Sequence, residues 1–168
     1  MTERSNIVER ADAHVVAELG GPSDKFEGAE PPIQHLRRVA EIIRGYGGTQ
    51  EQIAAGLLHD IIEDAGGRNA LPGLRKQFTD PVIDLVNACT DSWADTRIDP
   101  ATGEPFERKD PWWDRKVPYI AHIAEAPEAA LLVCAADKLD NVRRTHEAFR
   151  VKGDGAWQRF NKDSGRDG

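Results

Sequence analysis

Apolar residues recur at steps of three and four along most of the chain, which is the spacing of one buried face of an α-helix. The clearest example is the run Ile33, Leu36, Val39, Ala40 and Ile43. This spacing predicts a helix over residues 32–46, because two prolines at 31–32 suit its start and three glycines at 45, 47 and 48 suit its end. Thr49 and Gln52 then have the spacing of a capping box, so a second helix is expected from there through Asp60 or beyond.

The same pattern predicts further helices over residues 7–19, 71–78, 80–89, 111–125 and 127–150. From 92 to 110 the pattern fails, and prolines and a glycine lie among charged residues, so this stretch is expected to be a long loop. Strand-like alternation of useful length is absent from the sequence. The fold class predicted is therefore all-α: one compact helical bundle over residues 1–168, with its core at about 7–150 and a polar tail at 162–168.

Composition narrows the class of protein. A chain of 168 residues that is 39% hydrophobic suits one domain. The net charge of −7, without a basic stripe, argues against a nucleic-acid polymer as partner. The polar N-terminal segment and the lack of an apolar run near the roughly 20 residues of a membrane span predict a cytoplasmic protein that does not contact the membrane. Cys89 and Cys134 are expected to be reduced core thiols.

The strongest chemical signal is the segment from His59 and Asp60 to Glu63 and Asp64. It follows an apolar helical face, where four titratable groups are costly unless something pairs with them. On a helix, residues four apart lie on one side, so the four side chains form two adjacent columns. Carboxylates at the end of a helix oppose its dipole, so local stability does not explain them, and the segment indicates a site.

Two further residues extend this candidate site. Asp137 follows a long apolar run, where a buried carboxylate needs a metal ion or a cation as partner. His35 lies one turn into the helix over 32–46, beside its apolar stripe. A buried ion pair with an arginine remains open for Asp137, and a hydrogen-bonded core histidine remains open for His35. Two imidazoles with two carboxylates suit manganese, iron, zinc or nickel better than calcium.

The order His35, then His59-Asp60, then Asp137 resembles the signature of the HD-domain metal-dependent phosphohydrolases. The added Glu63-Asp64 pair and the segment 136–143 look like the hydrolase domain of the RelA/SpoT type, including the small alarmone hydrolases. The resemblance spans about residues 7–150. It implies an all-helical enzyme that hydrolyses a nucleotide phosphate or pyrophosphate ester.

The resemblance also implies a role for each matching residue. One divalent ion, manganese in the first instance, is expected on four ligands: His35, His59, Asp60 and Asp137. Glu63 and Asp64 are expected to position and deprotonate the attacking water, which agrees with the general chemistry of metal-assisted hydrolysis. Contacts to the substrate are expected from Lys25, Lys138, Asn141 and Arg143.

One departure from the family bears on the substrate. Alarmone hydrolases carry an Arg-Lys pair ten or eleven residues before the first histidine, whereas this chain has Asp24-Lys25. Lys25 is kept, but a carboxylate replaces the arginine that would stack on a base. The substrate expected first is guanosine tetra- or pentaphosphate, cleaved at the 3′-pyrophosphate. The alternatives are a (deoxy)nucleoside 5′-monophosphatase or another HD phosphoesterase and, in a different class, a nucleotide sensor without turnover.

Overall fold

The computed structural model of the chain describes residues 6–19, 30–64, 70–90, 95–98, 105–108 and 112–159. Helices account for most of these residues: α1 (Ile7–Leu19), α2 (Pro32–Gly45), α3 (Gln50–Leu58), α4 (Ile61–Asp64), α5 (Leu71–Gln77), α6 (Asp80–Cys89), α7 (Trp112–Glu125) and α8 (Glu128–Lys152). A 3₁₀ helix, η2 (Gly153–Arg159), follows α8. The all-α class predicted from the sequence is confirmed.

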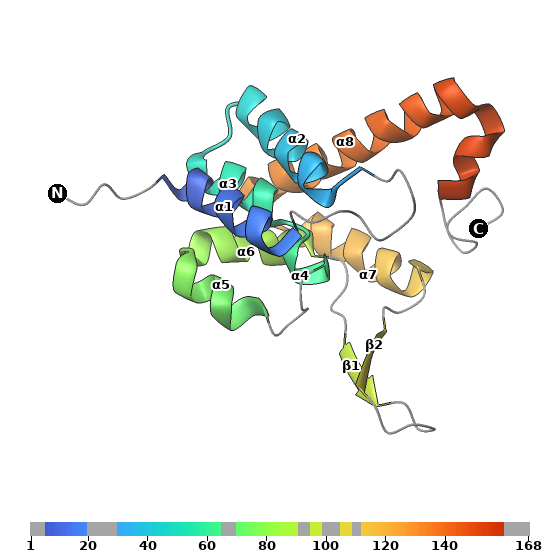
Figure 1. Ribbon diagram of the computed structural model, residues 1–168. Helices are drawn as coiled ribbons and strands as arrows, with labels where there is room; N and C mark the ends of the chain where they lie inside the picture. The colour runs from blue at the N-terminus through green and yellow to red at the C-terminus, as the bar shows by residue number, and fades with distance from the viewer. Residues whose placement is uncertain are drawn as a thin grey trace.

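The long helix α8 runs along the body of the molecule (Figure 1), where it packs against α2, α3 and α6. Helix α1 covers α3 from the other side, and α2 lies against both α1 and α3. One core is shared by these helices, and its fully buried members include Val15, Leu36, Val39, Ile43, Leu58, Ile83, Val86 and Val133. Segments distant in sequence are therefore fixed against one another in the region where the polar residues of α2, α3 and α8 meet.

The boundaries of α2 and α3 follow from local chemistry. Helix α2 ends in a Schellman motif, in which the amide of Gly48 donates to the carbonyl of Ile43 and that of Gly47 to Arg44. Gly47 has a φ of +77°, which glycine adopts without strain. Helix α3 begins with the predicted capping box, because the Thr49 hydroxyl accepts from the Gln52 amide while the Gln52 side chain accepts from the Thr49 amide.

The structure differs from the predicted elements at two places. The helix that follows Thr49 ends at Leu58, and a turn at His59 and Asp60 separates it from the short helix α4. Within the predicted loop over 92–110, the structure forms an antiparallel hairpin of β1 (Asp95–Ile98) and β2 (Pro105–Arg108), with Asp95 opposite Arg108. The hairpin projects away from the helices (Figure 1). Strands of four residues, the second of which begins at a proline, give too little alternation to be recognised in the sequence.

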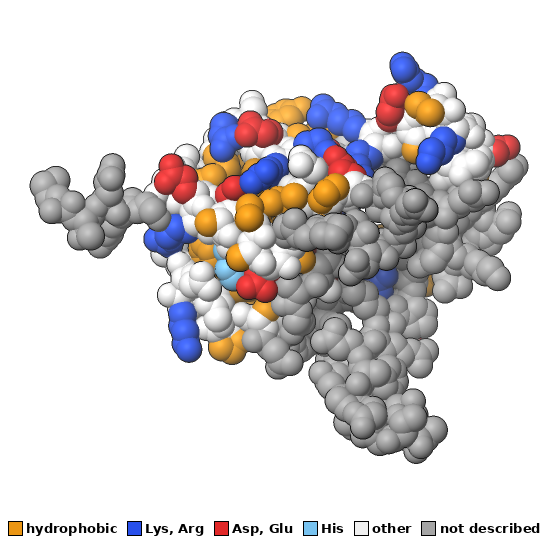
Figure 2. All heavy atoms as spheres, in the orientation of Figure 1, with side chains coloured by type: hydrophobic (Ala, Val, Ile, Leu, Met, Phe, Trp, Pro, Cys, Tyr) orange, Lys and Arg blue, Asp and Glu red, His pale blue; other side chains and the backbone are white. Residues whose placement is uncertain are grey.

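Surface charge, helix composition and burial bear on several further predictions. Lys and Arg side chains alternate with Asp and Glu on the face seen in Figure 2, and a continuous basic stripe is absent from the described part of that face. The absence of a nucleic-acid polymer partner stays a prediction. Among the described residues, none of the helices combines the length and the apolar character that crossing a membrane requires. Cys89 and Cys134 are both buried and free, as expected, and the polar tail at 162–168 lies outside the described residues.

Helices α2 and α3 approach closely at Gly56, so a larger residue at this position is expected to lower the stability of the protein. A Cβ atom added at Gly56 would overlap the Ile43 Cδ1 methyl, and Ile43 is fully buried, so its side chain has no free space to enter. We expect Gly56→Ala to lower the free energy of unfolding by about 1 kcal/mol or more, because overpacking outweighs the gain in helix propensity. Gly73→Ala is the matched control, since that helical glycine has nothing within 4 Å of the added carbon. This control should stabilise the protein by about 0.5 kcal/mol in urea unfolding, and equal effects of the two substitutions would refute the packing argument.

Candidate metal centre

Three separate parts of the chain deliver the four predicted ligands to one place. His35 comes from α2, His59 and Asp60 from the turn between α3 and α4, and Asp137 from α8. Nε2 of His35 lies 3.2 Å from Asp137 Oδ1, and Nε2 of His59 lies 3.6 Å from the same oxygen. Asp60 reaches both rings, with its oxygens 3.2 Å from His59 Nε2 and 3.8 Å from His35 Nε2. The possible ligand atoms of His35, His59 and Asp137 all lie within 4.8 Å of one another.

Burial differs among these four residues. His59 is 2% exposed, Asp137 is 7% exposed and His35 is 9% exposed, so two imidazoles and a carboxylate lie inside the protein. The Asp60 side chain is one-third exposed. Three of the four side chains therefore lie inside the protein, and Asp60 lies at the partly exposed edge of the group.

Both imidazoles are held so that Nε2 faces the centre. Nδ1 of His35 lies 2.7 Å from a carboxylate oxygen of Asp140, and Nδ1 of His59 lies 2.9 Å from the carbonyl oxygen of Gly56. We assign the proton of each ring to Nδ1, which can then donate to these acceptors. Among the described residues, His59 Nε2 is buried and has no hydrogen-bond partner, although Asp60 Oδ1 lies 3.2 Å away. This nitrogen lies where a second imidazole and two carboxylates converge. Together these groups fit the donor set of a divalent transition metal.

The electrostatics of the metal-free centre agree with a cation site. Burial disfavours protonated His59, but the charge of Asp60 and the contact with Asp137 outweigh it and raise the pKa of His59 to about 9. Burial would raise the pKa of Asp137, yet His35, His59 and Lys138 together hold it well below its usual range. The surroundings of the centre therefore favour positive charge at His59 and negative charge on Asp137.

Two of the residues predicted to contact substrate, Lys138 and Asn141, also contact Asp137. Lys138 Nζ is 2.6 Å from Asp137 Oδ2, and Asn141 Nδ2 is 2.5 Å from Asp137 Oδ1. Arg143 is exposed and lines a groove between α2 and α8. The arginine partner considered for Asp137 is not found among the described residues, where the cation beside this carboxylate is a lysine. The substrate roles of Lys138, Asn141 and Arg143 stay predictions.

The predicted catalytic carboxylates belong to α4. Glu63 lies near Lys116 of α7. Burial and the positive charge of Lys138 lower the pKa of Lys116, whereas the negative charges of Glu63, Asp137 and Asp60 act in the opposite direction. The Lys116 amine therefore lies within the field of the same carboxylates. Asp64 ends α4, and its side chain lies outside the described residues, as does Lys25 with the whole segment 20–29.

Three residues at this centre were not assigned a role from the sequence: Arg38, Lys116 and Asp140. Arg38 and Asp140 each lie three residues after a predicted ligand, His35 and Asp137, so helical spacing places them on the ligands' faces. This spacing could have indicated that Arg38 and Asp140 lie near the ligands. It does not indicate which partner each side chain contacts across the interface between α2 and α8. Lys116 carries no sequence signal, because its place depends on how α7 packs.

Comparisons with known proteins agree with this geometry. A model of the HD domain family matches residues 13–156. A GTP pyrophosphokinase of Streptomyces coelicolor is 30% identical over 151 residues, which are 89% of this chain and 16% of that protein. The chain thus spans less than a fifth of the length of this relative.

Two solved structures resemble the fold. One, described as a metazoan ortholog of SpoT that hydrolyzes ppGpp and plays a role in starvation responses, matches 88% of this chain and 74% of its own, with a TM-score of 0.67 and 23% identity. The other, lmo0812 from Listeria monocytogenes EGD-e, matches 77% of this chain and 73% of its own, with a TM-score of 0.59 and 29% identity.

Proposed function

Because this chain belongs to the HD-domain family of metal-dependent phosphohydrolases, we propose that it hydrolyses a phosphate or pyrophosphate ester of a nucleotide at the centre formed by His35, His59, Asp60 and Asp137. The observation that carries the proposal is the convergence of these four side chains from three segments of the chain at one largely buried point. Two imidazoles and two carboxylates gathered largely inside a protein call for a compensating cation, and a divalent transition metal fits this donor set.

The four side chains would hold one divalent ion, with manganese as the first choice for this mixture of imidazole and carboxylate. When bound, such an ion supplies water of lowered pKa and offsets negative charge on a phosphoryl oxygen. Glu63 then accepts the proton of the attacking water, and Asp64 shares in its positioning. Lys116 and Lys138 bring positive charge to the same place, where they favour binding of an anionic phosphate.

For the substrate, we favour guanosine tetraphosphate, with pyrophosphate leaving from the 3′ position. Glu63-Asp64 following His59-Asp60 supports this choice. So do the similar proteins, since one is named a GTP pyrophosphokinase and another is described as an ortholog of SpoT that hydrolyzes ppGpp. A second candidate, a (deoxy)nucleoside 5′-monophosphatase, is favoured by Asp24, which stands where an arginine would stack on the guanine.

Product analysis of the full chain tests the proposal. Manganese-loaded protein is incubated with guanosine tetraphosphate and with a panel of (deoxy)nucleoside 5′-monophosphates, and pyrophosphate and orthophosphate are measured separately. We expect pyrophosphate from guanosine tetraphosphate. Orthophosphate from the monophosphates alone would select the second candidate. Tight nucleotide binding without either product would favour a sensor and overturn the hydrolase proposal.

The protonation of His59 predicts a pH dependence of metal binding. Its pKa of about 9 lies above the ordinary histidine value, so the metal-free site keeps the proton below about pH 9, and an incoming ion must displace it. Metal affinity should therefore rise as pH increases toward about 9 and then level off. Calorimetry in buffers of different ionisation enthalpy should detect release of about one proton per manganese at about pH 7.5 and almost none at about pH 10. Affinity that stays constant across this range would contradict the protonated site.

A further inference from the structure

Asp140 is a buried carboxylate of α8 that the hydrolytic proposal does not use. It is 3% exposed and lies one turn beyond Asp137. Its Oδ2 is 2.7 Å from Nδ1 of His35, the ring nitrogen that faces away from the centre. A carboxylate placed there can accept the Nδ1 proton and thereby fix the tautomer of the ring.

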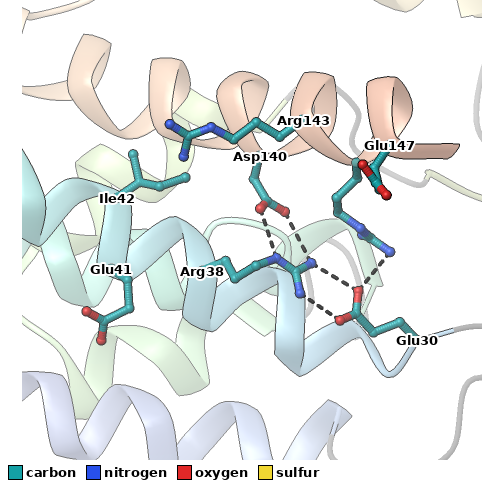
Figure 3. Close-up of a pocket in the computed structure, with 8 residues that line it drawn as sticks. Glu30, Arg38, Glu41, Ile42, Asp140, Arg143 and Glu147 are labelled. Atoms are coloured by element: carbon teal, nitrogen blue, oxygen red, sulfur yellow. Dashed lines mark hydrogen bonds and ion pairs between the residues drawn. The ribbon is translucent and has the colours of Figure 1, made fainter. Parts of the chain in front are cut away.

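Arg38 holds this carboxylate in place from α2. Its Nε lies 2.9 Å from Asp140 Oδ1 and one of its terminal nitrogens lies 3.3 Å from Oδ2, so the guanidinium meets both oxygens. The same guanidinium contacts both oxygens of Glu30, at 2.6 and 3.0 Å, and Arg144 lies 2.8 Å from Glu30. In Figure 3, Arg38 lies between Asp140 and Glu30 and is bonded to both. Two arginines thus balance two carboxylates, and the buried charge of Asp140 is compensated.

The two imidazoles of the centre are oriented by different means. His59 donates to the main-chain carbonyl of Gly56, which is fixed by the helix. His35 depends on a charged side chain from another helix, 105 residues away along the chain. A carboxylate partner orients an imidazole more strongly than a neutral carbonyl and makes its free nitrogen a better metal ligand.

We propose that Asp140 is a positioning residue, held by Arg38, that keeps His35 protonated on Nδ1 so that Nε2 presents its lone pair to the metal ion. This inference rests on the proposed function, because it assumes that His35 is a metal ligand. The alternative is that the ion pair merely ties α2 to α8. The two accounts differ in what they predict for metal affinity, as distinct from stability.

Manganese affinity of the full chain tests the inference, with free manganese measured by electron paramagnetic resonance. In Asp140→Asn, the amide can donate to Nδ1 and favour the tautomer whose Nε2 is blocked by a proton. We expect manganese to bind about 10- to 100-fold more weakly, while kcat recovers at saturating manganese because the role inferred for Asp140 is to orient His35. Arg38→Lys keeps the charge but cannot bond both carboxylates, and it should weaken binding in the same direction.

Arg37→Gln provides the matched control. Arg37 is the neighbour of Arg38 and makes a similar two-bonded pair, at 2.8 and 2.9 Å, with Asp12 of α1 on the exposed surface. Its removal should leave manganese affinity unchanged. Wild-type affinity in folded Asp140→Asn or, should that variant not fold, in Arg38→Lys would overturn the inference and leave the proposed function standing. A wild-type chain that binds no manganese would overturn both.

Discussion

Replacing Asp137 with alanine is expected to abolish turnover and to remove the bound metal at the same time. One oxygen of Asp137 lies 3.2 Å from Nε2 of His35 and 3.6 Å from Nε2 of His59, and its buried charge is part of what attracts a cation there. Loss of the metal's stabilisation of the transition state is worth several kcal/mol, so kcat/KM should fall about a thousandfold or more. Metal content after dialysis, measured by atomic emission, and pyrophosphate release are the two readouts.

Asp12→Ala is a suitable control for this substitution. Asp12 is also a helical aspartate in an ion pair, with Arg37, but it lies on α1 away from the centre. This variant should keep both its metal and its activity. An Asp137→Ala protein with full metal content would show that the ligand has been misassigned, whatever its activity.

Replacing Glu63 with glutamine should separate chemistry from metal binding. Glutamine has the same shape but cannot accept the proton of the attacking water, so kcat should fall by about 10²- to 10⁴-fold, while manganese content stays near that of the unmodified protein. Stopped-assay kinetics at saturating manganese measure the first quantity, and metal analysis measures the second. Glu51→Gln, on the exposed first turn of α3, is the matched control and should retain full activity.

The Glu63 result also distinguishes an enzyme from a nucleotide sensor. A sensor does not need a proton acceptor, so nucleotide binding would persist in Glu63→Gln and the unmodified protein would already lack turnover. Unchanged kcat in this variant would mean that another group takes the proton. The side chain of Asp64 on the same short helix would then be the next to replace.

Much of the helical fold could be predicted from the sequence, because amphipathic spacing and end signals are local. Helix α1 occupies the predicted span Ile7–Leu19, and α3 begins at the predicted capping box. The turn at His59 and Asp60 could not be predicted in this way, because a helical repeat continues through it in the sequence. After the turn, Ile61 and Ile62 enter the core while Asp60 stays partly exposed, an arrangement that depends on contacts between helices distant in sequence.

The candidate site was predictable in its residue types and only partly in its contacts. The unusual cost of placing His59 and Asp137 beside apolar faces could be recognised without a structure. The partners of these residues could not, since the hydrogen bond between His35 and Asp140 joins two helices whose relative rotation is set by the whole core. For the same reason, the contacts of Lys138 and Asn141 with Asp137 could not be predicted from the sequence, and their expected contacts with substrate stay predictions.

The most direct test of the metal centre is anomalous diffraction at the manganese edge from crystals of the full chain grown with manganese. We expect one strong peak, contacted by Nε2 of His35 and of His59 and by carboxylate oxygens of Asp60 and Asp137. A peak elsewhere, or no peak while the protein still hydrolyses nucleotides, would contradict the account.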